Sequence, residues 1–182
     1  MLTGFLLTRS WRDTATGIVL DLWFATDQGP HWVQINRQEC VMFLPRDQLE
    51  QAEALLQNTT GWRQAELPLK TFLNQPVNAF YFLSRRRARE FTQQLEAFDI
   101  PCWEADIKPP ERFLMERYIT AACTLGVAEN ASYVKTQKPS LNPRLSPADY
   151  RPSLKCLSID IETSMDAESL YSIAVWGCGV AK

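Results

Sequence analysis

The chain has 182 residues, which is enough for one domain and part of another. Apolar residues make up 46% and charged residues 22%, the balance of an ordinary globular protein, so a disordered chain is not expected. The net charge of −2 excludes a global basic field, so any contact with nucleic acid has to be local.

The first third of the sequence predicts strands. Apolar and polar residues alternate along Ile18–Thr26, as in a strand with one buried face. Helix signals follow Pro45, where Asp47 precedes a run with an apolar face that ends at Gly61. The other predicted strands are Phe5–Trp11, His31–Ile35, Val41–Leu44 and Trp62–Leu69. Several short strands around one helix predict a small curled sheet of OB-like character.

The second third predicts a strand–helix–strand unit. Ser84 is placed to cap a helix between two strands, Val77–Leu83 and Ile100–Ile107. Apolar residues recur at helical spacing on its expected inner face, at Ala88, Phe91, Leu95 and Phe98. A further helix, Glu111–Ile119, and a hairpin through Ala121–Lys135 follow. The expected fold class is therefore α+β.

A proline-rich, basic stretch then divides the chain. Residues 136–153 contain four prolines and little apolar content, which indicates an extended linker. We expect one domain over residues 1–135 and the start of a second over 154–182. Two strands, Leu154–Thr163 and Leu170–Val175, are predicted in this second part, and two strands cannot bury a core. The second domain is therefore expected to be incomplete.

Cysteine and histidine usage argues against a zinc site. The chain has five cysteines and one histidine, His31, and no two cysteines lie at a short metal-binding spacing. Reduced, mostly buried thiols are expected. No run of residues is long and apolar enough to span a membrane, so the expected location is the cytoplasm.

Two acidic residues carry the chemistry that the sequence suggests. Leu157, Ile159 and Ile161 fall on one face of the predicted strand, and Asp160 and Glu162 fall on the other. Two carboxylates on one face suit hard divalent cations, and paired cations are used in phosphoryl transfer. The alternative is that alternating charge marks an ordinary exposed strand face.

Basic residues suggest two places for DNA contact. Arg85, Arg86 and Arg89 crowd the first turns of the helix that begins near Ser84, and phosphate contact is one explanation. The alternative is a solvated helix face with Glu90 nearby. The basic residues of the linker region, Lys135, Lys138 and Arg151, interleave with tyrosines and also suit single-stranded nucleic acid. An ordinary solvated linker is the alternative there.

Three tryptophans, Trp23, Trp32 and Trp62, raise a similar choice. On an OB-like surface they would stack on bases, but residues of this kind are more often part of the core.

Several segments resemble family B DNA polymerases, and among them the bacterial DNA polymerase II group. Cys156–Thr163 resembles the first exonuclease motif of the family, and Asp149–Lys155 resembles its lead-in. Upstream, the segment Pro109–Ile119 resembles part of the N-terminal domain of these enzymes, as do Gly4–Thr14 and Trp23–Pro30. The resemblance covers nearly the whole chain.

The resemblance implies that Asp160 and Glu162 bind Mg²⁺ or Mn²⁺ as catalytic ligands of a 3′→5′ proofreading exonuclease with a ribonuclease-H-like fold. It implies template or single-stranded DNA and the rest of a polymerase chain as partners, with a sliding clamp contacted only through regions not present here. The remaining exonuclease carboxylates have no counterpart in 182 residues, so this polypeptide alone is expected to be inactive. The alternative is a stand-alone OB-like module that binds single-stranded nucleic acid.

Overall fold

The protein is described by a computed structural model, which covers residues 2–126, 138–177 and 180–181. The chain forms two compact units, Met1–Tyr150 and Arg151–Lys182. None of the helices in these described ranges is long and apolar enough to cross a membrane.

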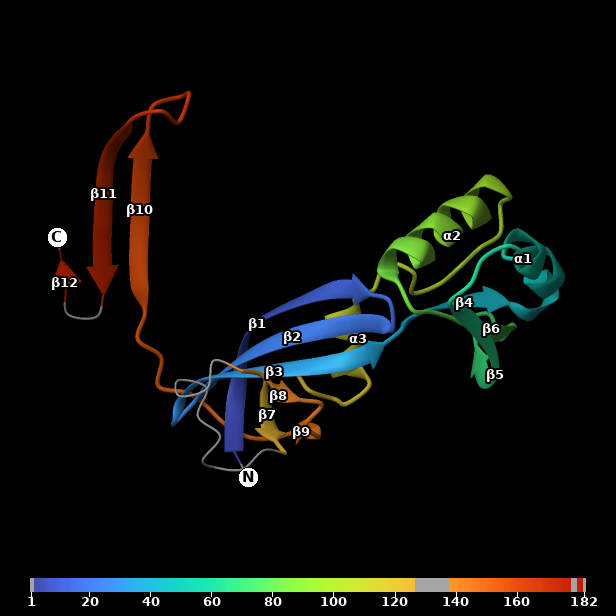
Figure 1. Cartoon of the computed structure of the whole chain (residues 1–182), viewed down its shortest axis with the longest axis horizontal. Coiled ribbons are helices and arrows are strands. Elements are labelled where there is room, and N and C mark those ends of the chain that lie inside the picture. The colour runs from blue at the N-terminus through green and yellow to red at the C-terminus, as the bar shows by residue number, and fades with distance from the viewer. Residues whose placement is uncertain (1, 127–137, 178–179, 182) are drawn as a thin grey trace. The chain divides into compact units, whose positions relative to one another are not determined.

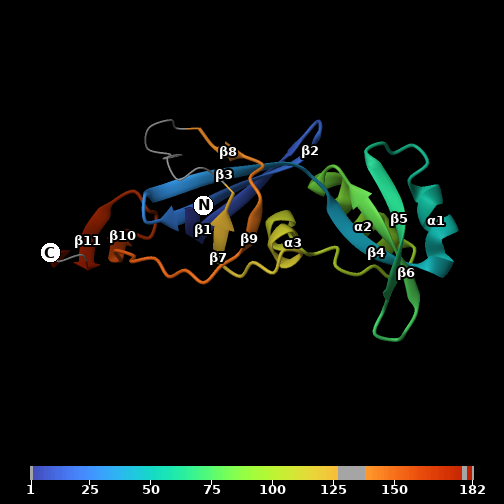
Figure 2. The ribbon, with the colours of Figure 1, turned by 90° about the horizontal axis from the view of Figure 1, so that it is seen from below.

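A twisted six-stranded sheet forms the base of the first unit (Figures 1 and 2). Its order is β8-β3-β2-β1-β7-β9, and only the pairing of β8 with β3 is parallel. Tight turns join the first three strands, so they pair as neighbours. The strands are β1 (Leu2–Thr14), β2 (Gly17–Thr26), β3 (Gly29–Gln38), β7 (Ala122–Leu125), β8 (Ser140–Leu141) and β9 (Leu145–Pro147).

The inner face predicted for the second strand is confirmed, but the strand is buried on both faces over Ile18–Leu22. The side chains of Ile18, Leu20, Leu22 and Phe24 on β2 are fully buried in the core. The opposite face of the same strand carries Asp21, whose carboxylate accepts hydrogen bonds from side chains of β1 and β3. The face of β2 away from the core therefore carries a polar cluster around Asp21 between the apolar side chains of Val19 and Trp23.

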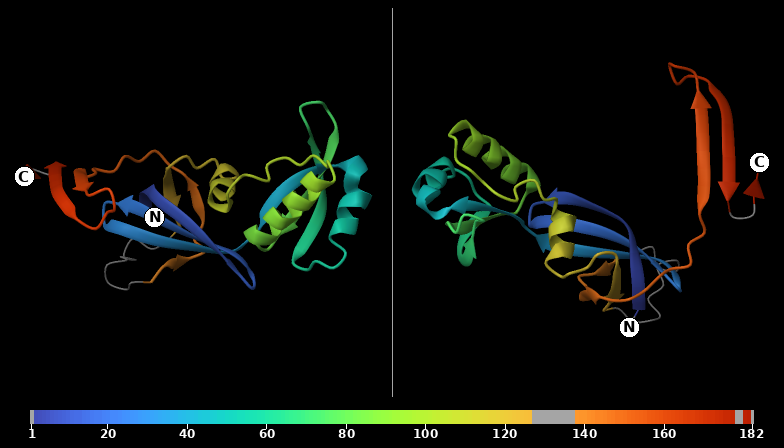
Figure 3. Two further views of the ribbon diagram at one scale, coloured as in Figure 1. Left: turned by 90° about the horizontal axis from the view of Figure 1, so that it is seen from above. Right: turned by 180° about the vertical axis from the view of Figure 1, so that it is seen from behind.

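A smaller lobe in the same unit consists of a second sheet and two helices. The antiparallel sheet has the order β4-β6-β5. Helix α2 contacts β4 and β6 and lies beside α1 (Figure 3). Aromatic rings fix this packing, because Phe91 of α2 lies 5.8 Å from Phe80 and 5.3 Å from Phe82 between ring centroids. The lobe consists of β4 (Cys40–Pro45), a 3-10 turn (Arg46–Gln48), α1 (Leu49–Leu55), β5 (Trp62–Lys70), β6 (Pro76–Phe82) and α2 (Arg85–Ala97).

Helix α2 begins and packs as its sequence predicts, but it ends early. The hydroxyl of Ser84 accepts a hydrogen bond from the N–H of Arg87, and Phe91 and Leu95 are buried. Phe98, expected on the inner face, is 55% exposed. It lies at the C-terminal cap, where the backbone leaves the helical conformation, so its side chain no longer follows the buried face.

The second strand of the expected strand–helix–strand unit is absent. Ile100–Ile107 makes only one bridge pair, between Trp103 and Phe43 of β4. Pro101 lacks an N–H for a ladder, and Glu104 has a positive φ of 60°, so pairing cannot extend in either direction. The next helix, α3 (Pro109–Met115), is shorter than expected, and Tyr118 with φ 55° lies beyond its end.

Part of the segment expected to be an extended linker pairs with the first sheet. Within the described residues 138–147, β8 pairs with β3 and β9 pairs with β7. Leu145 is buried in the core, and the burial of its apolar side chain stabilises the contact of this proline-rich segment with the sheet.

The second unit consists of three strands in the order β10-β11-β12 (Figure 1). They are β10 (Leu157–Thr163), β11 (Leu170–Gly177) and β12 (Val180–Ala181), all antiparallel. No helix of the described residues belongs to this unit. Its apolar side chains therefore stay exposed within the unit, such as Ile159 at 57% and Ile161 at 56%.

Candidate metal centre and nucleic-acid interface

The two acidic residues lie on the same face of strand β10. In the register with β11, Asp160 is opposite Ala174 and Glu162 is opposite Ser172. Residues two apart on a strand project to the same side, so both carboxylates leave the hairpin on one face. Both residues are exposed, and small side chains stand opposite them. The space in front of the pair is open within this unit.

This donor set fits part of a divalent cation site. Carboxylate oxygens are the ligands that Mg²⁺ and Mn²⁺ prefer, and Mg²⁺ needs six oxygens in octahedral geometry. Two carboxylates do not complete such a site. Among the described residues no group of three or more His, Cys, Asp or Glu side chains could hold a metal ion. Further ligands would have to come from residues other than these.

The Asp166 carboxylate in the β10–β11 loop stabilises the turn. Asp166 accepts hydrogen bonds from the Ser164 hydroxyl and from the Glu168 N–H, and these bonds lower the pKa of its carboxyl. Ser164 also accepts a bond from the N–H of Ser169. The Asp166 carboxylate is therefore occupied by hydrogen bonds within the loop, and it is not counted as a metal ligand beside Asp160 and Glu162.

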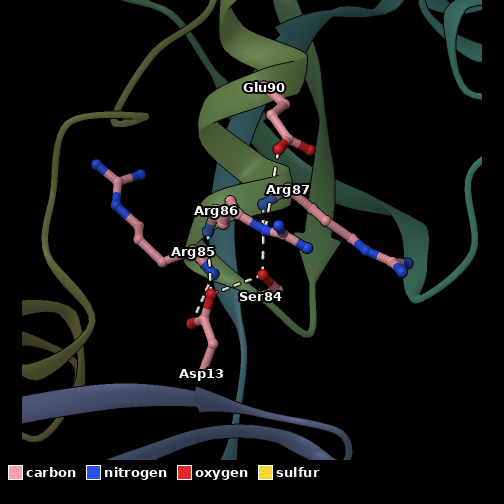
Figure 4. A network of polar contacts seen from close by, with 6 residues as sticks. All are labelled: Asp13, Ser84, Arg85, Arg86, Arg87 and Glu90. Atoms are coloured by element: carbon pink, nitrogen blue, oxygen red, sulfur yellow. Dashed lines mark hydrogen bonds and ion pairs between the residues drawn. The ribbon is translucent and has the colours of Figure 1, made fainter.

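The arginines of α2 meet a carboxylate that comes from β1 (Figure 4). Asp13 accepts hydrogen bonds from the Ser84 hydroxyl at 2.6 Å, the Arg85 N–H at 3.0 Å and the Arg86 N–H at 3.1 Å. Partial burial alone would raise the pKa of Asp13, but these bonds and the charge of Arg86 outweigh it and lower the pKa below 3.8. Asp13 thus supplies the anion that the start of this helix needs.

The three arginines predicted to bind nucleic acid are not equivalent. The Arg85 guanidinium is engaged, since it donates to the carbonyl oxygen of Ala105 at 2.6 Å. Arg86 is 78% exposed and makes only a loose ion pair with Glu90, at 3.9 Å. Arg89 is exposed. Arg86 and Arg89 are therefore the two whose guanidinium groups face solvent.

An open cleft of about 680 Å³ lies beside these arginines. Arg85, Arg89 and Lys108 line it, together with three acidic side chains, Glu96, Glu104 and Asp106. Equal numbers of basic and acidic groups leave no strong positive field in the cleft. Arg86 does not line this cleft, whereas Arg89 lies at it beside the acidic groups, so a phosphate contact by α2 is favoured at Arg86 over Arg89.

The basic residues predicted for the linker belong to different parts of the chain. Lys138 is exposed in the first unit and Arg151 is exposed in the second. Lys135 lies outside the described residues.

The tryptophans pack against other aromatic rings. Trp62 stacks on Phe80, with 5.8 Å between ring centroids, and its indole N–H donates to the Thr59 carbonyl oxygen. Trp23 and Trp32 are half-buried and stack on each other across β2 and β3 at 5.4 Å. These contacts favour the packing interpretation over base stacking.

Comparisons with known proteins agree with one another where they overlap. Residues 4–39 match the family model "DNA polymerase II, N-terminal", and residues 40–100 match "DNA polymerase II, insertion domain". DNA polymerase II of Escherichia coli strain K12 is 44% identical over 178 residues, which is 97% of this chain. The chain belongs to the DNA polymerase II family. It spans 22% of the length of that relative.

A solved family B polymerase has the same fold. The structure of the enzyme from the hyperthermophilic archaeon Pyrobaculum calidifontis covers 97% of this chain with a TM-score of 0.71 and 14% sequence identity. The match involves 25% of that chain. It confirms the mixed α+β architecture with a curled sheet at the start of a family B polymerase.

The boundary between the two family models coincides with a boundary in the fold. The N-terminal match ends after β3, and the insertion-domain match begins with Cys40, the first residue of β4. All of the smaller lobe, from β4 to α2, falls within residues 40–100. We therefore call this lobe, residues 40–100, the insertion lobe.

Sequence analysis missed Asp13, although a signal was present. The first turn of α2 contains Arg85, Arg86 and Arg87 and no acidic residue. Cations at that end oppose the helix dipole, so a compensating anion from another element is required. The sequence indicates the need for an anion. Only the folded structure, in which Asp13 of β1 lies at the start of α2, identifies which residue supplies it.

Proposed function

We propose that this chain is the N-terminal part of a DNA-directed DNA polymerase that also carries a 3′→5′ proofreading exonuclease. In this proposal the first unit is the scaffold, with an OB-like curled sheet that lies beside template DNA. Residues 154–182 form the start of the exonuclease domain and supply the first two strands of a ribonuclease-H-like fold. The membership of the chain in the DNA polymerase II family supports this assignment.

One observation carries the exonuclease part of the proposal: Asp160 and Glu162 share one face of a strand whose other face is apolar. The apolar face carries Ile159 and Ile161 and is exposed, as expected for a surface that the rest of a domain would bury. The two carboxylates would hold Mg²⁺ or Mn²⁺ together with ligands from other parts of the protein. Divalent ions in such sites polarise the scissile phosphate and activate water.

Substitutions in the longer polymerase test this role. Asp160→Ala and Glu162→Ala are each expected to reduce removal of 3′ nucleotides by at least about 100-fold, since each leaves the metal cage incomplete. DNA synthesis by the same variants should change little. Ser158→Ala, on the same face of β10 but without a carboxylate, is the matched control. Normal excision by the Asp160→Ala variant would refute the proposal.

The 182-residue polypeptide gives a second test. With Mg²⁺ or Mn²⁺ it should remove no 3′ nucleotides, because two carboxylates cannot hold the reactive pair of ions. Excision that Asp160→Ala abolishes would show that this chain has a complete site.

We also propose phosphate contacts from the basic residues, chiefly Arg86 and Arg89, with Arg85, Lys135, Lys138 and Arg151 in support. The exposure of the first two guanidinium groups supports this part. Each phosphate contact adds about 0.7 to the salt slope of single-stranded DNA binding. The double variant Arg86→Gln, Arg89→Gln should therefore lower the slope by about 1.4. An unchanged slope would favour the solvated helix face.

The family match does not favour a stand-alone module for single-stranded nucleic acid. We propose that the partners are DNA and the rest of the polymerase chain, and that a sliding clamp is contacted through other regions. The proposed location is the bacterial cytoplasm, at the nucleoid.

A further inference from the structure

Asp13 joins two parts of the first unit that have few other contacts. It lies near the end of β1, in the segment that matches the N-terminal family model, and its hydrogen-bond donors belong to α2 of the insertion lobe. Among the described elements, packing between the lobe and strands β1 to β3 is sparse. The ribbon views show the lobe as a body beside the six-stranded sheet (Figures 1 and 2).

Three donors converge on this one carboxylate (Figure 4). The hydroxyl of Ser84 and the N–H groups of Arg85 and Arg86 all point to it. Hydrogen bonds to an ionised acceptor are the stronger kind, and the positive end of the helix dipole adds to them. The contact is therefore directional and depends on the negative charge.

Arg85 extends the same contact to a third segment. Its N–H donates to Asp13, and its guanidinium donates to the carbonyl oxygen of Ala105, in the return segment from the lobe to α3. One residue at the start of α2 therefore ties β1, the lobe and the return segment together.

A second contact joins the lobe to the return segment that follows it. Phe43 and Trp103 exchange two backbone hydrogen bonds, of 3.0 Å and 2.9 Å. The chain itself enters the lobe through Glu39, whose carboxylate pairs with Arg63 of β5. These contacts do not depend on Asp13. They are the points at which the lobe would stay attached, as a pivot, if the Asp13 contact opened.

We propose that Asp13 and the N-terminal turn of α2 form a latch, which fixes the orientation of the insertion lobe on the six-stranded sheet and releases it when the carboxylate is lost. One cluster of buried side chains includes both sides, with Leu20 and Leu22 in the sheet and Phe80 in the lobe. The strands and helix of each side are expected to remain folded when the latch opens, because each side keeps these buried residues. The latch would operate whether or not Asp160 and Glu162 hold metal ions.

Residual dipolar couplings of the 182-residue protein test the latch, because they report the orientation of each part separately. In the wild type, the N–H couplings of β1 to β3 and of the lobe should fit one alignment tensor. In Asp13→Asn, the couplings of the lobe should no longer fit the tensor of the sheet, and the order of the lobe should fall below that of the sheet, as expected for a hinge released at one contact. Amide exchange of Arg85 and Arg86 should speed up about tenfold. The Trp103 amide at the pivot should remain protected.

Two further variants keep the test decisive. Asp27→Asn removes an acid in the turn after β2, whose carboxylate accepts a hydrogen bond from the Tyr150 hydroxyl, and should leave one tensor. Ser84→Ala removes one of the three donors without touching Asp13, and should give an intermediate loss of lobe order. Chemical shifts of β2 and β6 confirm that each variant is folded.

A single tensor in both Asp13→Asn and Ser84→Ala would overturn the proposal, since the lobe would then be rigid without the contact. Equal loss of order in the sheet and the lobe would overturn it too, because the contact would then serve global stability and not orientation.

Discussion

Replacing Asp21 by Asn removes a charge from the polar cluster on the face of β2 away from the core. The Asp21 side chain is 12% exposed and accepts hydrogen bonds from Arg12, from the Trp32 indole N–H at 3.0 Å and from the Gln34 amide at 3.0 Å. Asn keeps the shape and one acceptor oxygen, but its amide group then faces the Arg12 guanidinium. The Arg12 side chain is half exposed, so solvent screens the contribution of the Arg12–Asp21 ion pair to stability. Hydrogen bonds to charged groups contribute about 1.5–3 kcal/mol, and we expect a net loss of about 2 kcal/mol.

Urea unfolding measures this loss. With a slope of about 2 kcal/mol per M, the midpoint should fall by about 1 M. Asp27→Asn is the control, because this exposed acid makes one hydrogen bond, and its change should stay below about 0.5 kcal/mol. Equal midpoints for the wild type and Asp21→Asn would refute the reasoning, since the buried carboxylate would then contribute no more than a neutral amide.

Gly177→Ala would place a Cβ 2.4 Å from the Cys156 carbonyl oxygen at a φ of +113°. The paired end of the β10–β11 hairpin should therefore lose about 1–2 kcal/mol of stability and open more often. Unchanged amide exchange in that hairpin would contradict this. Burial raises the pKa of Cys40 to about 11 and of Cys123 to about 12, so iodoacetamide at neutral pH should modify exposed Cys156 before either of them. Mass spectrometry of the digested protein gives the order. Because folding lowers the pKa of Asp13, its stabilisation is complete above pH 3.8 and is lost as the pH falls through the lower folded value. The difference in unfolding free energy between wild type and Asp13→Asn should therefore shrink in acid, and a constant difference would contradict the shift.

Local patterns in the sequence predicted the local elements well. Alternation over Ile18–Thr26 gave the buried face of β2, and helical spacing at Phe91 and Leu95 gave the buried face of α2. Ser84 caps the helix as its position indicates. These features depend on neighbours within a few residues, which is what a periodic pattern records.

Long-range pairings could not be predicted in the same way. Strand β1 pairs with β7, so that Leu2 stands opposite Leu125, and no local pattern specifies such a partner. Proline content suggested that residues 136–153 lie apart from the sheet, yet Leu145 docks into its core. A second strand of the strand–helix–strand unit was expected at Ile100–Ile107, where Pro101 and the positive φ of Glu104 prevent pairing beyond one bridge.

In the candidate site too, local spacing predicted some features, and contacts with distant segments decided the others. The spacing of Asp160 and Glu162 was sufficient to place both on one strand face. The sequence did not separate Arg85, which bonds to Ala105, from Arg86, which faces solvent, because that difference depends on a segment 20 residues away.

The position of the insertion lobe between β3 and β7 has a consequence for the order of folding during synthesis. Strands β1 to β3 leave the ribosome before the lobe and can pair at once, and the lobe can then fold by contacts within residues 40–100. The outer edge of β1, however, has no partner until Leu125 has emerged. An unpaired edge invites association with other chains, so the nascent protein is most exposed to aggregation while the lobe is being made.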